Sequence, residues 1–189
     1  APPAQSSLRP AIACVKDVGG VCGMLALLLA RLATLPAHPP AGHVPAVQLI
    51  SDEGRFAAAG ASQHLRASGF EQRELDYGVV AVIGPQSSGK STLLNAMFGS
   101  GFSVMSASEG RSQTTRGIWL STTPTGQHLL LDVQGSDSSE AGDAGQTFER
   151  QSALFALAIA DVVLVNVWES DIGRREASSL ALLQLVLEV

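Results

Sequence analysis

The chain has 189 residues, the size of one domain, and apolar residues make up 46% of it, enough for a packed core. Only 15% of the residues are charged and the formal net charge is −5, whereas a nucleic-acid-binding domain normally carries a basic surplus. The two cysteines, Cys14 and Cys22, do not make a disulfide framework, and no histidine is spaced to complete a zinc site with them.

Residues 1–45 are rich in alanine and contain seven of the nine prolines. This composition argues against regular packed elements outside the apolar run at residues 21–30. The run is shorter than the roughly 20 residues of a membrane span, and its length fits a short helix or the hydrophobic region of a signal peptide. We favour the helix because the flanking charges are weak. The first residue is alanine, so we expect a processed chain or an incomplete gene model.

From residue 47 onwards, apolar runs alternate with helix-like stretches. Runs of β-branched residues, as at 77–83 and 161–167, are typical of strands buried on both faces. The predicted strands are 47–50, 77–83, 117–121, 128–132 and 161–167, and the predicted helices are 55–69, 91–98, 148–160 and 174–189. This alternation predicts an α/β fold, a three-layer sandwich around a mainly parallel sheet.

Two long polar segments interrupt these elements: the first loop at residues 100–116 and the second loop at residues 134–147. Irregular segments longer than about 12 residues inside a compact domain are usually functional or disordered. Ligands of open α/β sheets bind at the carboxyl ends of the strands. We therefore expect both loops, and the glycine-rich turn after residues 77–83, to lie at that edge.

This glycine turn, residues 84–91, matches the pattern G-x-x-x-x-G-K-[ST] between a predicted strand and a predicted helix. Gly84 and Gly89 allow backbone torsions that a side chain would forbid, so successive N–H groups can surround phosphate oxygens. Lys90 is expected to reach the β- and γ-phosphates, and the hydroxyl of Ser91 to bind Mg²⁺. The turn predicts binding of a nucleoside triphosphate without choosing between GTP and ATP.

Two further segments favour a switch GTPase over an ATPase. Such a GTPase needs a threonine in its first mobile loop, whose hydroxyl joins the Mg²⁺ shell. Thr115 is our candidate, and its neighbour Thr114 is the alternative. The sequence DVQG at residues 132–135 matches D-x-x-G directly after a strand, so the aspartate would hold Mg²⁺ and the N–H of Gly135 would sense the γ-phosphate. The predicted metal ligands are Ser91, Thr115 and Asp132.

Longer signatures carry a resemblance to a known family. They are GPQSSGKSTLLNAMFG, FSVM, GRSQTTRGIWLS, LDVQGSD and FERQSALFALAIADVVLVNVWESDIGR. These stretches resemble the plant root-hair-defective and yeast Sey-type GTPases, the functional counterparts of animal atlastins. The resemblance begins near residue 48 and runs to residue 189.

The resemblance implies a P-loop GTPase domain of the dynamin superfamily over residues 46–189, preceded by a segment, residues 1–45, whose composition is typical of disorder. In that family GTP and Mg²⁺ drive homodimerisation of domains on opposing membranes. A helical bundle and a transmembrane hairpin follow the domain, which faces the cytosol. The outcome is fusion of endoplasmic reticulum membranes.

The resemblance also implies roles within the glycine turn, where Gln86 and Ser87 occupy positions used in catalysis. Atlastins place an arginine finger at the position of Ser87, so the transition-state charge here must come from a monovalent cation near Ser87 or from Arg111 or Arg116. The expected catalytic residues are Gln86, Ser87, Lys90 and Thr115. The expected nucleotide contacts are Gly84, Pro85, Gln86, Ser87, Ser88, Gly89, Lys90, Ser91, Thr92, Asp132 and Gly135.

The chain departs from the family pattern, which has Glu, Gly and Arg where this sequence has Gln134, Ser138 and Ser139. We expect the loss of that arginine to affect loop ordering, dimer contacts and hydrolysis more than nucleotide binding. The family's guanine-reading segment would follow residue 189, so we expect the sheet to be incomplete at its C-terminal end. The alternatives are a nucleotide-dependent dimerisation module with little turnover, and an inactive fragment of a longer protein.

Overall fold

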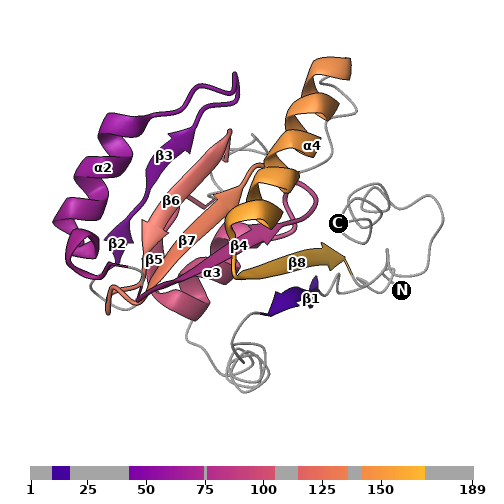
Figure 1. Ribbon diagram of the computed structural model, residues 1–189. Helices are drawn as coiled ribbons and strands as arrows, with labels where there is room; N and C mark the ends of the chain where they lie inside the picture. Colours follow the sequence, from indigo (N-terminus) through magenta and orange to yellow (C-terminus); the bar gives the residue numbers. More distant parts are fainter. Residues whose placement is uncertain (1–9, 18–42, 75, 105–114, 136–141, 169–189) are drawn as a thin grey trace.

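The computed structural model describes residues 10–17, 43–74, 76–104, 115–135 and 142–168. Its strands are β1 (Pro10–Asp17), β2 (Val44–Pro45), β3 (Val47–Ile50), β4 (Gly78–Ile83), β5 (Ser100–Gly101), β6 (Ile118–Thr122), β7 (His128–Val133) and β8 (Val162–Trp168). The α-helices are α2 (Ala58–Ala67), α3 (Lys90–Phe98) and α4 (Gly142–Ile159), and Phe70–Gln72 form a 3₁₀ turn. The described part is therefore an α/β fold (Figure 1).

Six of the strands form one mixed sheet in the order β1-β8-β4-β7-β6-β3. The central strand β4 runs parallel to β7 and to β8, whereas β1, β6 and β3 pair with their neighbours in antiparallel fashion. The expectation of a mainly parallel sheet was therefore wrong. A tight turn at residues 123–126 joins β6 to β7, and a turn this short can only make an antiparallel hairpin.

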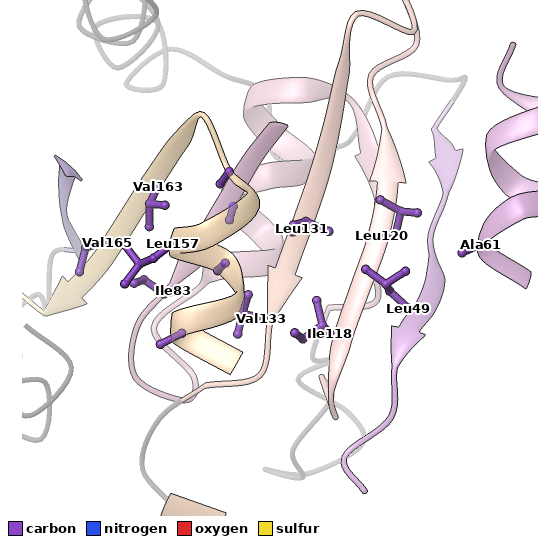
Figure 2. Close-up of a cluster of buried hydrophobic side chains, with 14 of the residues drawn as sticks. Leu49, Ala61, Ile83, Ile118, Leu120, Leu131, Val133, Leu157, Val163 and Val165 are labelled. Atoms are coloured by element: carbon purple, nitrogen blue, oxygen red, sulfur yellow. The ribbon is translucent and has the colours of Figure 1, made fainter. Parts of the chain in front are cut away.

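Helices cover both faces of this sheet. Alternate residues of β4 point to opposite sides: Ala81 and Ile83 join one buried cluster, and Val80 and Val82 join another. The first cluster packs against α4 and α2, as Figure 2 shows for Leu157 and Ala61. The second cluster includes Leu94 of α3. Burying each such Val, Leu or Ile side chain contributes about 1.5–3 kcal/mol, so the two clusters fix the position of β4.

The predicted strands and the first two helices are confirmed, with ends that move by a few residues. Helix α4 differs, because it begins at Gly142 and not at Phe148. The Gly- and Asp-containing stretch that predicted a loop continues a helix held on the sheet by Ala153, Ala156 and Leu157, and such packing overrides weak local propensity. The second loop is correspondingly shorter.

The region before residue 46 also differs from expectation, because it contains β1 and β2. Strand β1 pairs with β8 and forms one edge of the sheet. Pro10 is its first residue, a position where the missing N–H of proline is tolerated. The apolar run at 21–30 and the predicted helix at 174–189 lie outside the described residues. No helix within the described ranges is long and apolar enough to cross a membrane.

Candidate functional site

The glycine turn connects the end of β4 to the start of α3, at the carboxyl edge of the parallel strands. Gly84 has a φ of +147°, and a Cβ there would lie 2.0 Å from the backbone oxygen of Asn166 in β8. A side chain at this position would therefore force β4 and β8 apart. The chain bends at Gly84 because only glycine allows this close approach.

Asn166 also holds the turn through its side chain. Its Nδ2 donates to the backbone oxygen of Ser88 at 2.9 Å and to Ser88 Oγ at 3.3 Å, and both residues are buried. The sequence analysis did not single out Asn166, whose one signal is that it is a polar residue within the apolar run of β8. Its Oδ1 is buried without a hydrogen-bond partner. Asn166 thus fixes the middle of the glycine turn to the sheet.

Lys90 is the first residue of α3 and is only 6% exposed. Its Nζ donates to the backbone oxygen of Pro85 at 2.7 Å, so the ammonium group reaches back over the glycine turn. The positive end of the helix dipole lies at the same point. The turn therefore combines a buried ammonium, the first N–H groups of a helix and a local positive potential, which together suit an anion.

Three oxygen-bearing side chains meet beside Lys90. Ser91 Oγ donates to Asp132 Oδ2 at 2.5 Å, and Thr115 Oγ1 donates to the same oxygen at 3.3 Å. The two hydroxyl oxygens lie 3.2 Å apart. The first loop, β7 and α3 thus each contribute one side chain, and all three predicted metal ligands are brought together.

Asp132 is 1% exposed, and its second carboxylate oxygen, Oδ1, is buried and has no hydrogen-bond partner among the described residues. Burial raises the pKa of Asp132, although the hydrogen bond from Ser91, the charge of Lys90 and the hydrogen bond from Thr115 act in the opposite direction. A buried carboxylate with an unsatisfied oxygen is costly unless a cation or donor reaches it. The described residues hold no cluster of three His, Cys, Asp or Glu side chains, so an ion here would rely on hydroxyl oxygens as well.

Gly135 brings the D-x-x-G segment against the glycine turn. A Cβ at this position would lie 2.5 Å from Gln86 Cα and 2.8 Å from Lys90 Nζ, so no larger residue fits without displacement. The backbone at Gly135 therefore passes close to the ammonium group of Lys90, with no room for a side chain between them. Ser87 has a φ of +58° at the exposed tip of the turn.

The remaining predicted residues are less enclosed. Ser87, Gly89 and Thr92 are exposed and Gln86 is half-buried, whereas Pro85 is buried. The two candidate arginines differ: Arg111 lies outside the described residues, and Arg116 is exposed with Nη1 4.0 Å from Asp52 Oδ2. Thr114, the alternative to Thr115, also lies outside the described residues. Both tryptophans are half-buried, and Trp119 packs against the cluster on the α3 face.

The comparisons with known proteins define the class as a GTPase domain. Residues 83–189 match the family described as the Root hair defective 3 GTP-binding protein (RHD3) GTPase domain. The chain belongs to this family.

Several relatives share the same region. Protein ROOT HAIR DEFECTIVE 3 homolog 1 of Oryza sativa subsp. japonica is 49% identical over 146 residues, which are 76% of this chain and 17% of the relative. Protein SEY1 homolog 1 of Trichomonas vaginalis is 48% identical over 142 residues, 75% of this chain and 18% of the relative. Protein ROOT HAIR DEFECTIVE 3 homolog 2 of Arabidopsis thaliana is 46% identical over 144 residues, 75% of this chain and 17% of the relative. The chain therefore spans less than a fifth of the length of these relatives.

Proposed function

We propose that this chain binds GTP together with Mg²⁺ and hydrolyses the γ-phosphate bond, as part of a three-layer P-loop sandwich. Its membership of the RHD3 GTPase domain family and the helices on both sheet faces support this. The observation that carries the proposal is the meeting of Lys90, Ser91, Thr115 and Asp132 at the carboxyl end of β4 and β7.

The triphosphate would be bound mainly by Lys90 and the backbone of the glycine turn. The Lys90 ammonium donates to the backbone oxygen of Pro85, a neutral acceptor, and an anionic phosphate oxygen would be a stronger acceptor. Helix α3 begins at Lys90, and the first N–H groups of a helix together with its dipole favour an anion at that end. Gly135 adds a backbone group beside the lysine, where a γ-phosphate would lie.

The three-oxygen cluster fits Mg²⁺, which prefers carboxylate, hydroxyl and water oxygens. Ser91 and Thr115 would supply hydroxyl oxygens, and the orphaned Oδ1 of Asp132 is an acceptor buried in the same place. When bound, Mg²⁺ neutralises charge on the phosphate oxygens and favours in-line displacement. The ion would also remove the desolvation cost of an ionised Asp132.

Hydrolysis would depend on positioning rather than on covalent chemistry by the protein. We assign Gln86 and Ser87, at the exposed side of the turn, and Thr115, in the first loop, to orienting the reacting groups around the γ-phosphate. The charge on the transition state would come from a monovalent cation near Ser87 or from Arg111 or Arg116. Arg116 would have to leave its neighbour Asp52 to serve this purpose.

Equilibrium titration of the 189-residue chain tests binding. We expect saturable binding of GTP in Mg²⁺, weaker binding when the metal is chelated, and weak competition by ATP. Absence of binding to any nucleoside triphosphate would contradict the proposal. Phosphate release in sodium, potassium and choline salts then tests the source of charge, because equal rates in all three would rule out the cation and leave the arginines.

A second candidate is a nucleotide-dependent dimerisation module with little turnover. The departures from the family pattern at Gln134, Ser138 and Ser139 favour it, because they fall in the segment that follows Asp132. A single-turnover assay separates the two: tight GTP binding without phosphate release over hours supports the module. An inactive fragment of a longer protein would show neither.

For the protein of which this chain is a part, we propose a role in endoplasmic reticulum membrane fusion through GTP-dependent homodimers, with the domain facing the cytosol. Membrane attachment would lie in other regions. The support is family membership alone.

A further inference from the structure

The end of the first loop is held by a group of hydrogen bonds that the proposed mechanism does not use. Gly117 N–H donates to the side-chain Oε1 of Gln134 at 2.6 Å, and the backbone N–H of Gln134 donates to the oxygen of Gly117 at 2.8 Å. The backbone oxygen of Arg116 accepts two hydrogen bonds. One comes from the indole N–H of Trp119 at 2.9 Å, and the other from the side-chain Nε2 of Gln48 at 3.1 Å. The two residues directly after Thr115 are therefore held by hydrogen bonds with three side chains, those of Gln134, Trp119 and Gln48.

Gln134 belongs to the D-x-x-G segment and contacts the end of the first loop, the two segments that would sense a γ-phosphate. On its C-terminal side is Gly135, whose backbone abuts Gln86 and Lys90. Through its side chain it holds Gly117, and two residues before Gly117 is Thr115, whose hydroxyl faces Asp132. Gln134 thus joins the backbone at Gly135 to the segment that carries Thr115, and the hydrogen bond of its side-chain Oε1 goes to Gly117 rather than to Lys90 or Asp132.

We infer that Gln134 is a positioning residue that couples the D-x-x-G segment to the first loop, so that the triphosphate and the Thr115 hydroxyl are bound together. This inference rests on the proposed function. Its physical basis is directional: Oε1 is an acceptor aimed at one backbone N–H, and that N–H has no other hydrogen bond in the described structure. Gln134 would therefore favour triphosphate over diphosphate, because only a triphosphate has the γ-phosphate that would lie between Gly135 and Thr115.

The choice of substitution follows from this chemistry. Gln134→Met keeps the length of the side chain and removes the acceptor, whereas Gln134→Glu keeps an acceptor oxygen. Gln72→Met is the matched control, because Gln72 is exposed in the 3₁₀ turn away from the glycine turn. The readouts are the affinities of the full chain for a non-hydrolysable GTP analogue and for GDP, and amide hydrogen exchange of residues 115–118.

We expect Gln134→Met to weaken binding of the analogue about fivefold, the effect of one lost hydrogen bond, while GDP affinity changes by less than about twofold. Exchange at residues 115–118 should accelerate in Gln134→Met, and Gln134→Glu should restore both properties. A purely structural role would lower both affinities equally. Equal loss, or no loss, would overturn the inference while leaving the proposed function intact. A wild-type chain that binds neither nucleotide would overturn the proposed function and the inference with it.

Discussion

The sheet has an aspartate at each end of its parallel strands, and the two differ in burial and in hydrogen bonding. At the amino end, Asp161 is half-buried and its Oδ2 accepts the backbone N–H of Val79 at 2.8 Å, so it ties the start of β4 to β8. At the carboxyl end, Asp132 is fully buried, accepts two hydroxyl groups through Oδ2, and leaves Oδ1 without a partner. Asp161 thus has a partner within the fold, whereas Asp132 keeps one buried carboxylate oxygen that no described residue hydrogen-bonds.

The buried charged side chains also distinguish the two ends of the sheet. Where the structure describes side chains, Lys90 and Asp132 are the only buried members of the Lys, Arg, Asp and Glu residues, and both lie at the carboxyl end. Taking an ion out of water costs several kcal/mol even after relaxation, so a protein seldom keeps such groups for stability. This difference in buried charge between the two ends is what we expect if the carboxyl end binds a charged ligand, as proposed above. The predictions below test that difference.

The largest expected effect is that of Lys90→Ala, with Arg73→Ala as the matched loss of one positive charge. Arg73 donates to the backbone oxygen of Thr125 in the hairpin at the amino end. We expect Lys90→Ala to weaken GTP binding by about 1,000-fold, because a buried donor to the phosphates is lost. Arg73→Ala should leave GTP affinity unchanged, and calorimetric titration measures both. Equal affinities of the two variants would abolish the distinction between the ends.

Gly135→Ala should have the next largest effect. The added Cβ would lie 2.5 Å from Gln86 Cα and 2.8 Å from Lys90 Nζ, so either the glycine turn or the lysine must move. A clash costing about 3 kcal/mol would weaken GTP binding about 100-fold. Gly60→Ala is the control, since a Cβ there meets nothing within 4 Å and lies in helix α2. It should raise thermal stability slightly and leave GTP binding as it is; unchanged binding in Gly135→Ala would refute the close approach.

Asp132→Asn should separate stability from function. Loss of the carboxylate should weaken Mg²⁺-dependent GTP binding about 30-fold, as for other polar groups around a metal. Burial raises the pKa of Asp132 in the folded chain above its value in the unfolded chain. Ionisation of Asp132 therefore begins to lower the free energy of unfolding once the pH exceeds the pKa of the unfolded chain. The loss of stability is complete once the pH exceeds the pKa of the folded chain. At neutral pH we therefore expect the melting temperature of Asp132→Asn to rise by about 3 °C.

Asp161→Ala should behave in the reverse manner. It removes the acceptor of Val79 N–H, which costs about 1 kcal/mol of unfolding free energy and leaves GTP binding unchanged. Thermal unfolding and titration of both aspartate variants check the pair. Should Asp132→Asn melt lower than the wild type, or Asp161→Ala lose GTP affinity, the two aspartates would not have the separate roles assigned here.

Thr115→Val should have the smallest effect of this series. It removes one hydroxyl from the cluster with Ser91 and Asp132 and keeps the shape of the side chain. We expect GTP affinity in Mg²⁺ to fall about fivefold, with no change when the metal is chelated. Thr114→Val should leave both affinities unchanged. The reverse result would transfer the metal-binding role to Thr114.

The sequence predicted those parts of the candidate site whose residues are close together along the chain. The glycine turn, its flanking strand and helix, and the D-x-x-G segment are local patterns, and the structure places Lys90, Ser91, Thr115 and Asp132 together. Their roles toward a nucleotide remain predictions. The contact of Asn166 with Ser88 joins residues 78 positions apart, and that of Gln134 with Gly117 joins 17. Such pairs depend on strand register, which propensities and motifs do not contain.

The same limit explains the errors in the fold. Strand β6 is antiparallel to β7 because the short turn at residues 123–126 joins them. Strand β1 is antiparallel to β8 and extends the sheet on that side. Neither pairing has a signal in hydrophobic periodicity. The early start of α4 follows from the packing of its later turns. The apolar residues Ala153, Ala156 and Leu157 fix the helix on the sheet. Because helix formation is cooperative, the helix extends from these residues into its polar first turns.

The most direct test is a crystal structure of the chain with Mg²⁺ and a non-hydrolysable GTP analogue. We predict that Lys90 Nζ leaves the oxygen of Pro85 for phosphate oxygens, and that the ion lies among Ser91, Thr115 and Asp132. An analogue bound away from residues 84–91, or a Lys90 that keeps its bond to Pro85 while the phosphates lie elsewhere, would contradict the assignment of the buried charges to ligand binding.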